Sequence, residues 1–184
     1  GSTPPSFGSD TDIVDIGAYE YENTNIAPVF TSGDSFSIDE NKTLVGTVTA
    51  NDSEGDILTF SVSGTDLSIS ASGVLTFNAA PDYETQSSYT ATVTVTDGTN
   101  SVTQFVTISV LDVNEVPIFT SPSSFNVAEN QTDVGKVSAT DPEGDALTFS
   151  VSGSDLSIES TGELTFVSLP DYETQSSYTA TVTV

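Results

Sequence analysis

Residues 81–95 and residues 170–184 carry the same sequence, PDYETQSSYTATVTV. The likeness extends beyond this stretch: residues 28–95 align with residues 117–184 at a constant offset of 89, and 47 of the 68 aligned residues are identical. A long repeat with the texture of β-strands indicates tandem domains in an array. We therefore expect two copies of one domain, repeat one (residues 28–116) and repeat two (residues 117–184).

The shared stretch predicts β-structure. In residues 89–95, apolar side chains alternate with threonines, which is the two-residue period of a half-buried strand. Residues 102–110 repeat this alternation, and Asp97-Gly98 between the two runs predicts a hairpin turn. Five more segments of repeat one are predicted strands: residues 36–38, 44–50, 58–62, 67–69 and 74–77. Seven short strands in one repeat predict an all-β fold, a two-sheet sandwich.

The chain is strongly acidic. It has 27 acidic residues, two lysines and no histidine, so its formal net charge is −25. This charge argues against nucleic acid as a partner, because phosphate binding requires clusters of lysine and arginine. The acids either spread over the surface for solubility or gather into carboxylate clusters that bind divalent cations. They recur at fixed positions of the two repeats, which favours the clusters.

Side chains for catalysis are scarce. The sequence has no histidine, cysteine or arginine, so a nucleophile and its base are hard to assemble, and we expect no enzymatic activity. Without cysteine the fold has no disulfides, although the composition is otherwise that of an extracellular protein. The absence of tryptophan counts against a carbohydrate-binding surface.

Acids recur where the predicted strands end. Glu40, Asp82 and Glu84 are expected at the pole of repeat one that adjoins the connector to repeat two. Three more acids are expected at the opposite pole: Asp52, Glu54 and Asp97. End-to-end stacking would bring the exit acids of one repeat against the entry acids of the next. Calcium takes six to eight oxygen ligands and magnesium prefers a stricter octahedron, so such a junction favours calcium.

In this order, the motifs resemble those of tandem cadherin repeats of the bacterial surface type. The matching motifs of repeat one are Pro28-Val29-Phe30, Glu40-Asn41, Asp52-Ser53-Glu54, Asp82-Tyr83-Glu84, Asp97-Gly98 and Asp112-Val113-Asn114-Glu115. Repeat two carries Pro117-Ile118-Phe119, Glu129-Asn130, Asp141-Pro142-Glu143 and Asp171-Tyr172-Glu173. The resemblance implies two seven-strand Greek-key sandwiches of Ig-like architecture, the second incomplete at its C-terminal end, after a tail of residues 1–27.

The resemblance also implies calcium ligands. Two ions nearer repeat one would be held by Glu40, Asp82, Glu84, Asp112 and Glu115. A third ion, nearer repeat two, would be held by Asn114, Asp141 and Glu143. The upstream pole would hold at most one ion, through Asn25, Asp52, Glu54 and Asp97. The chain departs from the family pattern where Glu115-Val116 replaces Asp-Asn in the connector and where Glu54 and Glu143 replace aspartates.

As function, the resemblance implies a calcium-stiffened adhesion or stalk module on a cell surface, part of a larger secreted or membrane-anchored protein. Its partners would be calcium, neighbouring repeats, and other surface proteins or glycans, with homophilic adhesion as a family expectation. The alternative is a carbohydrate-binding or spacer module of a secreted enzyme. Residues 13–21 weakly resemble the closing strand of a right-handed parallel β-helix, which would make that enzyme polysaccharide-active; a plain linker explains them equally well.

Overall fold

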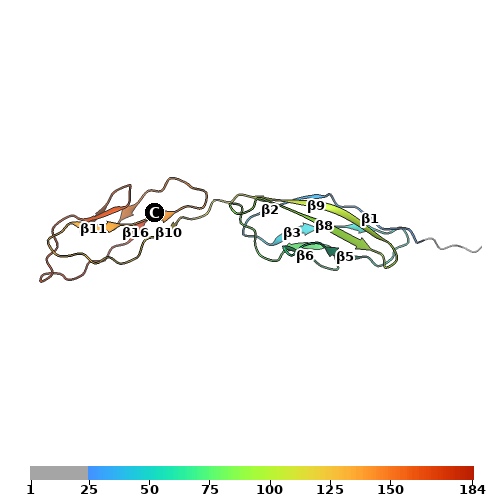
Figure 1. Cartoon of the computed structure of the whole chain (residues 1–184), viewed down its shortest axis with the longest axis horizontal. Coiled ribbons are helices and arrows are strands. Elements are labelled where there is room, and N and C mark those ends of the chain that lie inside the picture. Colours follow the sequence, from blue (N-terminus) through green and yellow to red (C-terminus); the bar gives the residue numbers. More distant parts are fainter. Residues whose placement is uncertain (1–24) are drawn as a thin grey trace, which may run out of the picture.

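The computed structural model describes residues 25–184, so the β-helix resemblance of residues 13–21 lies outside the described residues. In the described range all regular structure is β-strand, and no helix there is long and apolar enough to cross a membrane. Strands β1–β9 pair only with one another, as do β10–β16. Figure 1 shows the two groups end to end, joined by a short connector.

Repeat one is a sandwich of two main sheets. The four-stranded sheet has the order β2 (Ser35–Asp39), β9 (Ser101–Leu111), β8 (Ser88–Thr96), β5 (Thr59–Val62), and β2 and β9 are parallel. The three-stranded sheet has the order β3 (Leu44–Thr47), β7 (Val74–Phe77), β6 (Leu67–Ile69). A short antiparallel pair joins β1 (Val29–Phe30) to β4 (Ala50–Asn51). The expected all-β sandwich is thus confirmed.

One predicted strand is wrong. Residues 44–50 form two strands, β3 and β4, which belong to different sheets. Between them Val48 is fully buried, and its backbone N–H donates to the carbonyl of Gly73 at 2.8 Å. Gly73 has a φ of 82°, and a Cβ there would lie 2.1 Å from the Val48 carbonyl oxygen. The crossing between sheets therefore requires glycine at this position.

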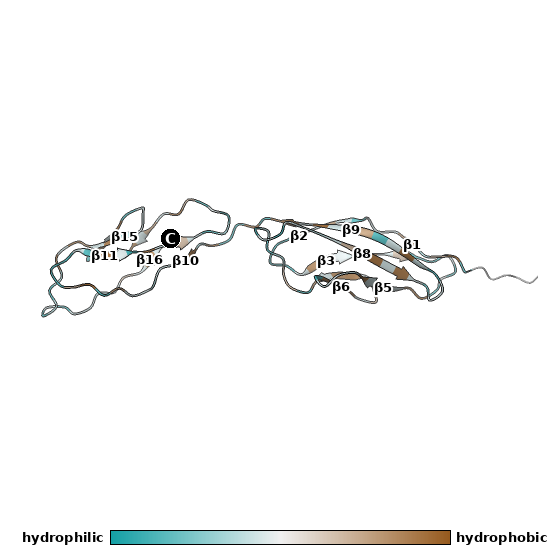
Figure 2. Cartoon of the chain, in the orientation of Figure 1, coloured by the Kyte–Doolittle hydropathy of each residue, from teal (hydrophilic) through white to brown (hydrophobic). Residues whose placement is uncertain are grey.

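The core of repeat one follows the alternation of the two long strands. Val93 and Val95 of β8 and Val106 and Ile108 of β9 are fully buried, and the residues between them face outward. Leu75 of β7 closes the same core from the facing sheet. In Figure 2 the strands change between apolar and polar colours along their length. This pattern is the expected one for antiparallel sheets with one wet face.

Repeat two has the same strand arrangement as repeat one, but fewer of its residues lie in strands. Its seven strands are β10 (Ile118–Phe119), β11 (Asp133–Lys136), β12 (Ala139–Thr140), β13 (Ser150–Val151), β14 (Leu156–Ile158), β15 (Glu163–Phe166) and β16 (Val182–Thr183). The sheet β11-β15-β14 copies β3-β7-β6, and β10-β12 copies β1-β4. Of the described core residues, only Val137 and Leu164 belong to repeat two. Among the described residues, repeat two thus contributes fewer buried side chains than repeat one.

Candidate metal centre at the junction of the repeats

Four acids converge at the junction: Glu40, Glu84, Asp112 and Glu143. One carboxylate oxygen from each lies within 4.8 Å of the others. Glu40 and Asp112 directly follow β2 and β9, which end side by side because these strands are parallel and in register from Ser35↔Thr107 to Asp39↔Leu111. Glu84 comes from the turn before β8, and Glu143 follows β12 of repeat two. We call this set the junction cluster.

Glu40 is the anchor of the junction cluster. Its side chain is only 1% exposed. One carboxylate oxygen accepts the backbone N–H of Tyr83 at 2.9 Å, and the other accepts the N–H of Val113, also at 2.9 Å. A carboxylate that accepts two backbone donors can remain buried at low cost. Glu40 thereby fixes the turn that carries Glu84 and the connector that carries Asp112.

Asn41 is a further part of the site that the sequence interpretation left without a role. Its φ is 61°, in the left-handed region that asparagine tolerates better than most residues. Its side-chain amide donates to Glu115 at 2.6 Å. In the sequence, the signal for this residue is the Glu-Asn pair that recurs in both repeats. Asn130, the copy of Asn41 in repeat two, has the same φ.

The ionised state of the acids in the junction cluster is electrostatically unfavourable without a neighbouring positive charge. Desolvation, and then the negative charges of Glu40, Asp112 and Glu143, raise the pKa of Glu84 above its ordinary value. Desolvation, followed by the neighbouring Asp141, also raises the pKa of Glu143. Among residues 25–184 the one ion pair joins Lys136 to Glu163, so it does not neutralise this cluster.

The donor set suits a hard cation. Oxygen Oε2 of Glu143 is buried and has no hydrogen-bond partner, although buried polar atoms are almost always paired. Calcium coordinates carboxylate, carbonyl and amide oxygens, and it tolerates irregular geometry. Carboxylates from four separate segments of the chain are such a set. The residues present therefore fit calcium.

Four other predicted ligands lie around the junction cluster without joining it. The Asp82 carboxylate accepts the N–H and the hydroxyl of Thr85, both at 3.0 Å. Oδ1 of Asp141 accepts the backbone N–H of Asp145 at 3.0 Å. The remaining two are connected to each other and to the cluster: Asn114 donates to the carbonyl of Glu115 at 3.0 Å, and the Glu115 N–H donates to Glu143 at 3.2 Å.

At the upstream pole Asn25 lies beside Asp97, while Asp52 accepts hydrogen bonds from its own loop. Asp52 is 7% exposed and accepts the N–H of Glu54 at 2.9 Å through Oδ1. Asp97 accepts the N–H groups of Thr99 and Asn100 through Oδ1, and the Asn100 bond is the main cause of its lowered pKa. The Oδ2 atoms of Asp52 and Asp97 are both buried without a partner. The Glu54 side chain instead accepts the Ser53 hydroxyl at 2.8 Å.

A third acidic group lies in repeat two, formed by Glu129, Asp171 and Glu173. The offset of 89 makes these residues the copies of Glu40, Asp82 and Glu84. All three side chains are exposed, and the contact from the Tyr172 N–H to Glu129 is long, at 3.4 Å. The Glu129 group is therefore looser than the junction cluster.

The chain is similar to known proteins in sequence and in fold. Residues 25–109 match the family described as Bacterial Ig domain. The EC1-2 structure of human protocadherin-24 superposes with a TM-score of 0.55 at 18% identity, over 87% of this chain and 94% of that one. The EC1-4 structure of Drosophila N-cadherin gives 0.54 at 20% identity, over 82% and 43%. The chain has the fold of tandem cadherin repeats. The predicted family resemblance is thus confirmed at the level of the fold.

A curated relative adds a second kind of similarity. Chitinase A of Pseudoalteromonas piscicida is 39% identical over 105 residues, which are 55% of this chain. The match spans only 13% of that enzyme. Cadherin-like and Ig-like repeats are typically non-catalytic, and typical of extracellular or surface proteins.

Proposed function

We propose that the chain is a calcium-binding stalk or adhesion module in which calcium stiffens the junction between cadherin-like repeats. The supporting observation is the junction cluster, in which carboxylates from both repeats and the connector lie within 4.8 Å of one another. Four like charges at this separation repel, by about 1 kcal/mol per pair even in bulk water. A divalent cation would convert this repulsion into a cross-link between the repeats.

In this proposal Glu40, Glu84, Asp112 and Glu143 provide the first carboxylates for calcium. The ligands added by small side-chain rotations are Asp82, Asn114, Glu115 and Asp141. The upstream pole is a separate, weaker site, formed by Asn25, Asp52, Glu54 and Asp97. When bound, calcium supplies fixed positive charge and no reaction chemistry, so the module is a structural and binding protein rather than an enzyme.

Calorimetric titration with calcium tests the proposal. The chain should bind calcium with release or uptake of heat, and its melting temperature should rise between chelator and millimolar calcium, because a ligand of the native state stabilises by mass action. The control variant Asp66→Asn should show the same response to calcium as the parent chain, because it removes one exposed acid outside the acidic clusters. A chain that melts at the same temperature in chelator and in calcium would refute the proposal.

Extracellular placement follows as part of the same proposal, with neighbouring repeats and other surface proteins or glycans as partners. Homophilic contact is the mode of pairing that it suggests. Sedimentation of the chain with and without calcium measures it, since self-association in calcium alone is expected. If the chain stays monomeric in calcium up to high concentration, homophilic pairing is wrong and the stalk function alone is left of the proposal.

The chitinase relative supports a second candidate, a spacer or carbohydrate-binding module of a secreted polysaccharide-active enzyme. Exposed aromatic side chains are available for sugar contacts at Phe105 and Tyr172, which are 61% and 65% exposed. Co-sedimentation with chitin tests binding, and Phe105→Ser and Tyr172→Ser are the variants to compare. If the parent chain is retained on chitin and each substitution abolishes the retention, this candidate is favoured. If the parent chain is not retained, only the spacer role is left.

A further inference from the structure

The outer face of the four-stranded sheet in repeat one carries a double row of hydroxyl groups. On this face all five outward residues of β8 and four of the five outward residues of β9 before Leu111 are serine or threonine. They stand opposite one another in the pairs Thr96–Ser101, Thr94–Thr103, Thr92–Phe105, Thr90–Thr107 and Ser88–Ser109. All of them are exposed or half-buried. We call the residues of these five pairs the hydroxyl track.

The neighbouring strands widen the hydroxyl track. Ser61 of β5 lies opposite Thr94, and Ser37 of β2 lies opposite Ser109. Side chains on one face of a strand are about 6.7 Å apart, and neighbouring strands are about 4.8 Å apart. The five pairs therefore form a regular array that extends roughly 27 Å along β8 and β9.

This face is also nearly free of charge. In the four strands of the sheet, Asp39 at one corner is the single charged residue. Strands of repeat two do carry charges, at Asp133 and Lys136 of β11 and at Glu163 of β15. The hydroxyl track is thus a neutral surface on a chain of net charge −25.

The hydroxyls of the track are available to a ligand. Thr96 donates to the carbonyl of Asn100 at 2.7 Å, at the end of the track. Within residues 25–184, no two hydroxyls of the track bond to each other, whereas Ser68 and Thr76 of the other sheet are bonded at 2.9 Å. Each hydroxyl can both donate and accept a hydrogen bond.

Phe105 lies in the middle pair of the hydroxyl track. Its side chain is 61% exposed. An aromatic ring offers a large apolar area and contributes strongly when a ligand covers it. Along the strands the ring has Thr94 and Thr103 on one side, and Thr90 and Thr107 on the other. The track therefore combines a stacking surface with hydrogen-bonding groups on both sides of it.

This combination selects the chemistry of the partner. An anionic partner is repelled by the rest of the chain, and a cationic one would be attracted to the acidic clusters at the poles instead. A single exposed ring is a smaller apolar patch than protein or membrane docking sites present. Sugar rings have apolar C–H faces that stack on an aromatic ring and hydroxyls at their edges. An uncharged polysaccharide therefore matches the hydroxyl track.

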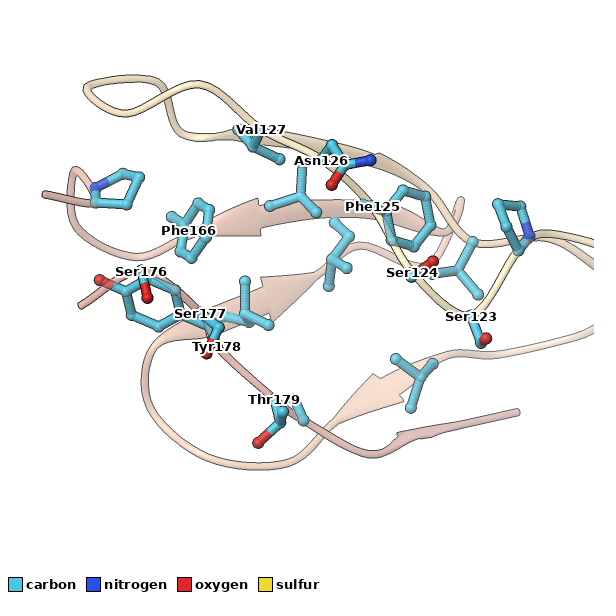
Figure 3. Close-up of a pocket in the computed structure, with 18 of the residues that line it drawn as sticks. Ser123, Ser124, Phe125, Asn126, Val127, Phe166, Ser176, Ser177, Tyr178 and Thr179 are labelled. Atoms are coloured by element: carbon cyan, nitrogen blue, oxygen red, sulfur yellow. The ribbon is translucent and has the colours of Figure 1, made fainter. Parts of the chain in front are cut away.

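The same alternation of side chains occurs in repeat two. In Figure 3 the ring of Tyr178 lies beside Phe166, and Thr179 points away from Phe166. Ser150 lies opposite Thr183, as the equivalent residues of β5 and β8 do in repeat one. The outward hydroxyls are thus shared by both repeats.

We propose that the hydroxyl track binds an extended, uncharged polysaccharide along β8 and β9. One sugar ring stacks on Phe105, and its neighbours bond to the threonines on either side. The inference rests on the second candidate of the proposed function, a carbohydrate-binding module, and gives it a site and a class of ligand. It does not depend on calcium, because no residue of the track belongs to the junction cluster.

The test uses the whole chain with two uncharged polysaccharides, chitin and cellulose. Co-sedimentation with the insoluble polymers measures binding, and NMR titration with their soluble oligosaccharides locates it. Amide shifts should change in β8 and β9 and stay constant in β3, β6 and β7. This map does not require any substitution.

Variants of outward residues test the two kinds of contact. Phe105→Ser should weaken binding roughly tenfold or more, because it removes the stacking ring. The double variant Thr94→Val/Thr103→Val keeps the shape of both side chains and removes their hydroxyls. It should weaken binding roughly threefold or more, since each hydrogen bond contributes a modest net free energy.

Two exposed residues of β3, in the other sheet, provide matched controls. Leu44 is 62% exposed, so Leu44→Ser removes an apolar side chain as accessible as Phe105. Thr47→Val removes an exposed hydroxyl. Both should change binding by less than about twofold.

Weaker binding by both track variants, with unchanged controls, supports the proposal. If the parent chain binds neither polysaccharide, the carbohydrate-binding candidate is wrong and this inference with it. If the parent binds but the track variants bind equally well, or the amide shifts occur in the other sheet, the candidate holds and the hydroxyl track is not its site. Equal weakening by Leu44→Ser and Phe105→Ser also overturns the inference.

Discussion

At the scale of single residues, the substitution Glu84→Gln tests calcium binding, because its expected effect is favourable without calcium and unfavourable with it. Without calcium its carboxylate is repelled by three neighbours, so Glu84→Gln should raise the melting temperature of repeat one. With calcium the same substitution removes a charged ligand, and affinity should fall roughly tenfold or more, since the number of charged ligands tunes calcium affinity. Melting curves in chelator and calorimetry in calcium measure the two effects.

Asp66→Asn provides the comparison for Glu84→Gln, since it removes one negative charge from an exposed loop. It should leave calcium affinity unchanged. If Glu84→Gln instead lowered the melting temperature equally in chelator and in calcium, the carboxylate would have a structural role and no part in ion binding.

The raised pKa values of Glu84 and Glu143 predict a pH dependence. For an acid whose folded pKa lies above its unfolded value, the folded state takes up the proton first, so stability in chelator increases as pH falls through the folded pKa. Acidification from about pH 7 to about pH 5 should therefore raise the melting temperature in chelator. In calcium the same protons compete with the ion, and affinity should fall.

The double variant Glu84→Gln/Glu143→Gln separates these two groups from the other carboxylates. It should show a smaller rise of the melting temperature in chelator over the same pH range. A rise equal to that of the parent chain would mean that other acids cause the effect.

Sequence reasoning identified the acids of the junction but could not orient them. It predicted Asp82 and Glu84 as ligands alike, yet Thr85 engages the Asp82 carboxylate locally, while Glu84 lies in the junction cluster. Short polar side chains often bond to nearby backbone instead of a distant group, and a motif does not reveal which occurs. The role of Asn41 depends on its left-handed backbone and on a contact 74 residues away, which no local pattern contains.

At the scale of elements, identical sequence takes different structure in the two repeats. Residues 89–95 pair with β9 along their whole length, and residues 93–95 also pair with β5, whereas residues 178–184 contribute only β16. Backbone amides with fewer partners open at lower free energy and exchange faster. Hydrogen exchange should therefore be faster at residues 178–184 and 147–151 than at their counterparts in repeat one. Equal rates would show that pairing does not control local stability here.

The crossing from β3 to β4 gives a second prediction at this scale. Gly73→Ala should destabilise repeat one by about 2–4 kcal/mol, because it combines a left-handed backbone with a clash against the Val48 carbonyl. Gly64→Ala is the matched control: its φ is also positive, at 86°, but a Cβ there meets nothing within 4 Å. Urea denaturation measures both. Equal losses would assign the effect to backbone strain alone.

The same crossing shows what limited prediction of the fold. Alternating residues predicted most strands of repeat one within one or two positions, because a half-buried strand has a period of two. The period does not show where a strand leaves one sheet for the other. Residues 44–50 look continuous in sequence, and only the packing of Val48 against Gly73 divides them.

At the scale of the whole molecule, the junction decides how the two sandwiches move relative to each other. Glu143 is the single member of the junction cluster that repeat two supplies, so it is the residue through which calcium would connect the repeats. Without calcium, repulsion among the four carboxylates should let the joint bend. With calcium bound, the scattering of the chain should become that of one extended rigid body, as in Figure 1.

Small-angle scattering in chelator and in calcium measures this change, and Glu143→Gln should reduce it while each sandwich stays folded. Glu163→Gln is the control, since it also removes a glutamate of repeat two but lies outside the junction cluster, in the ion pair with Lys136. If calcium stiffens the Glu143→Gln chain as much as the parent, the ions bind within repeat one and the connector alone. The cadherin-like likeness would then describe the fold of this joint but not its mechanics.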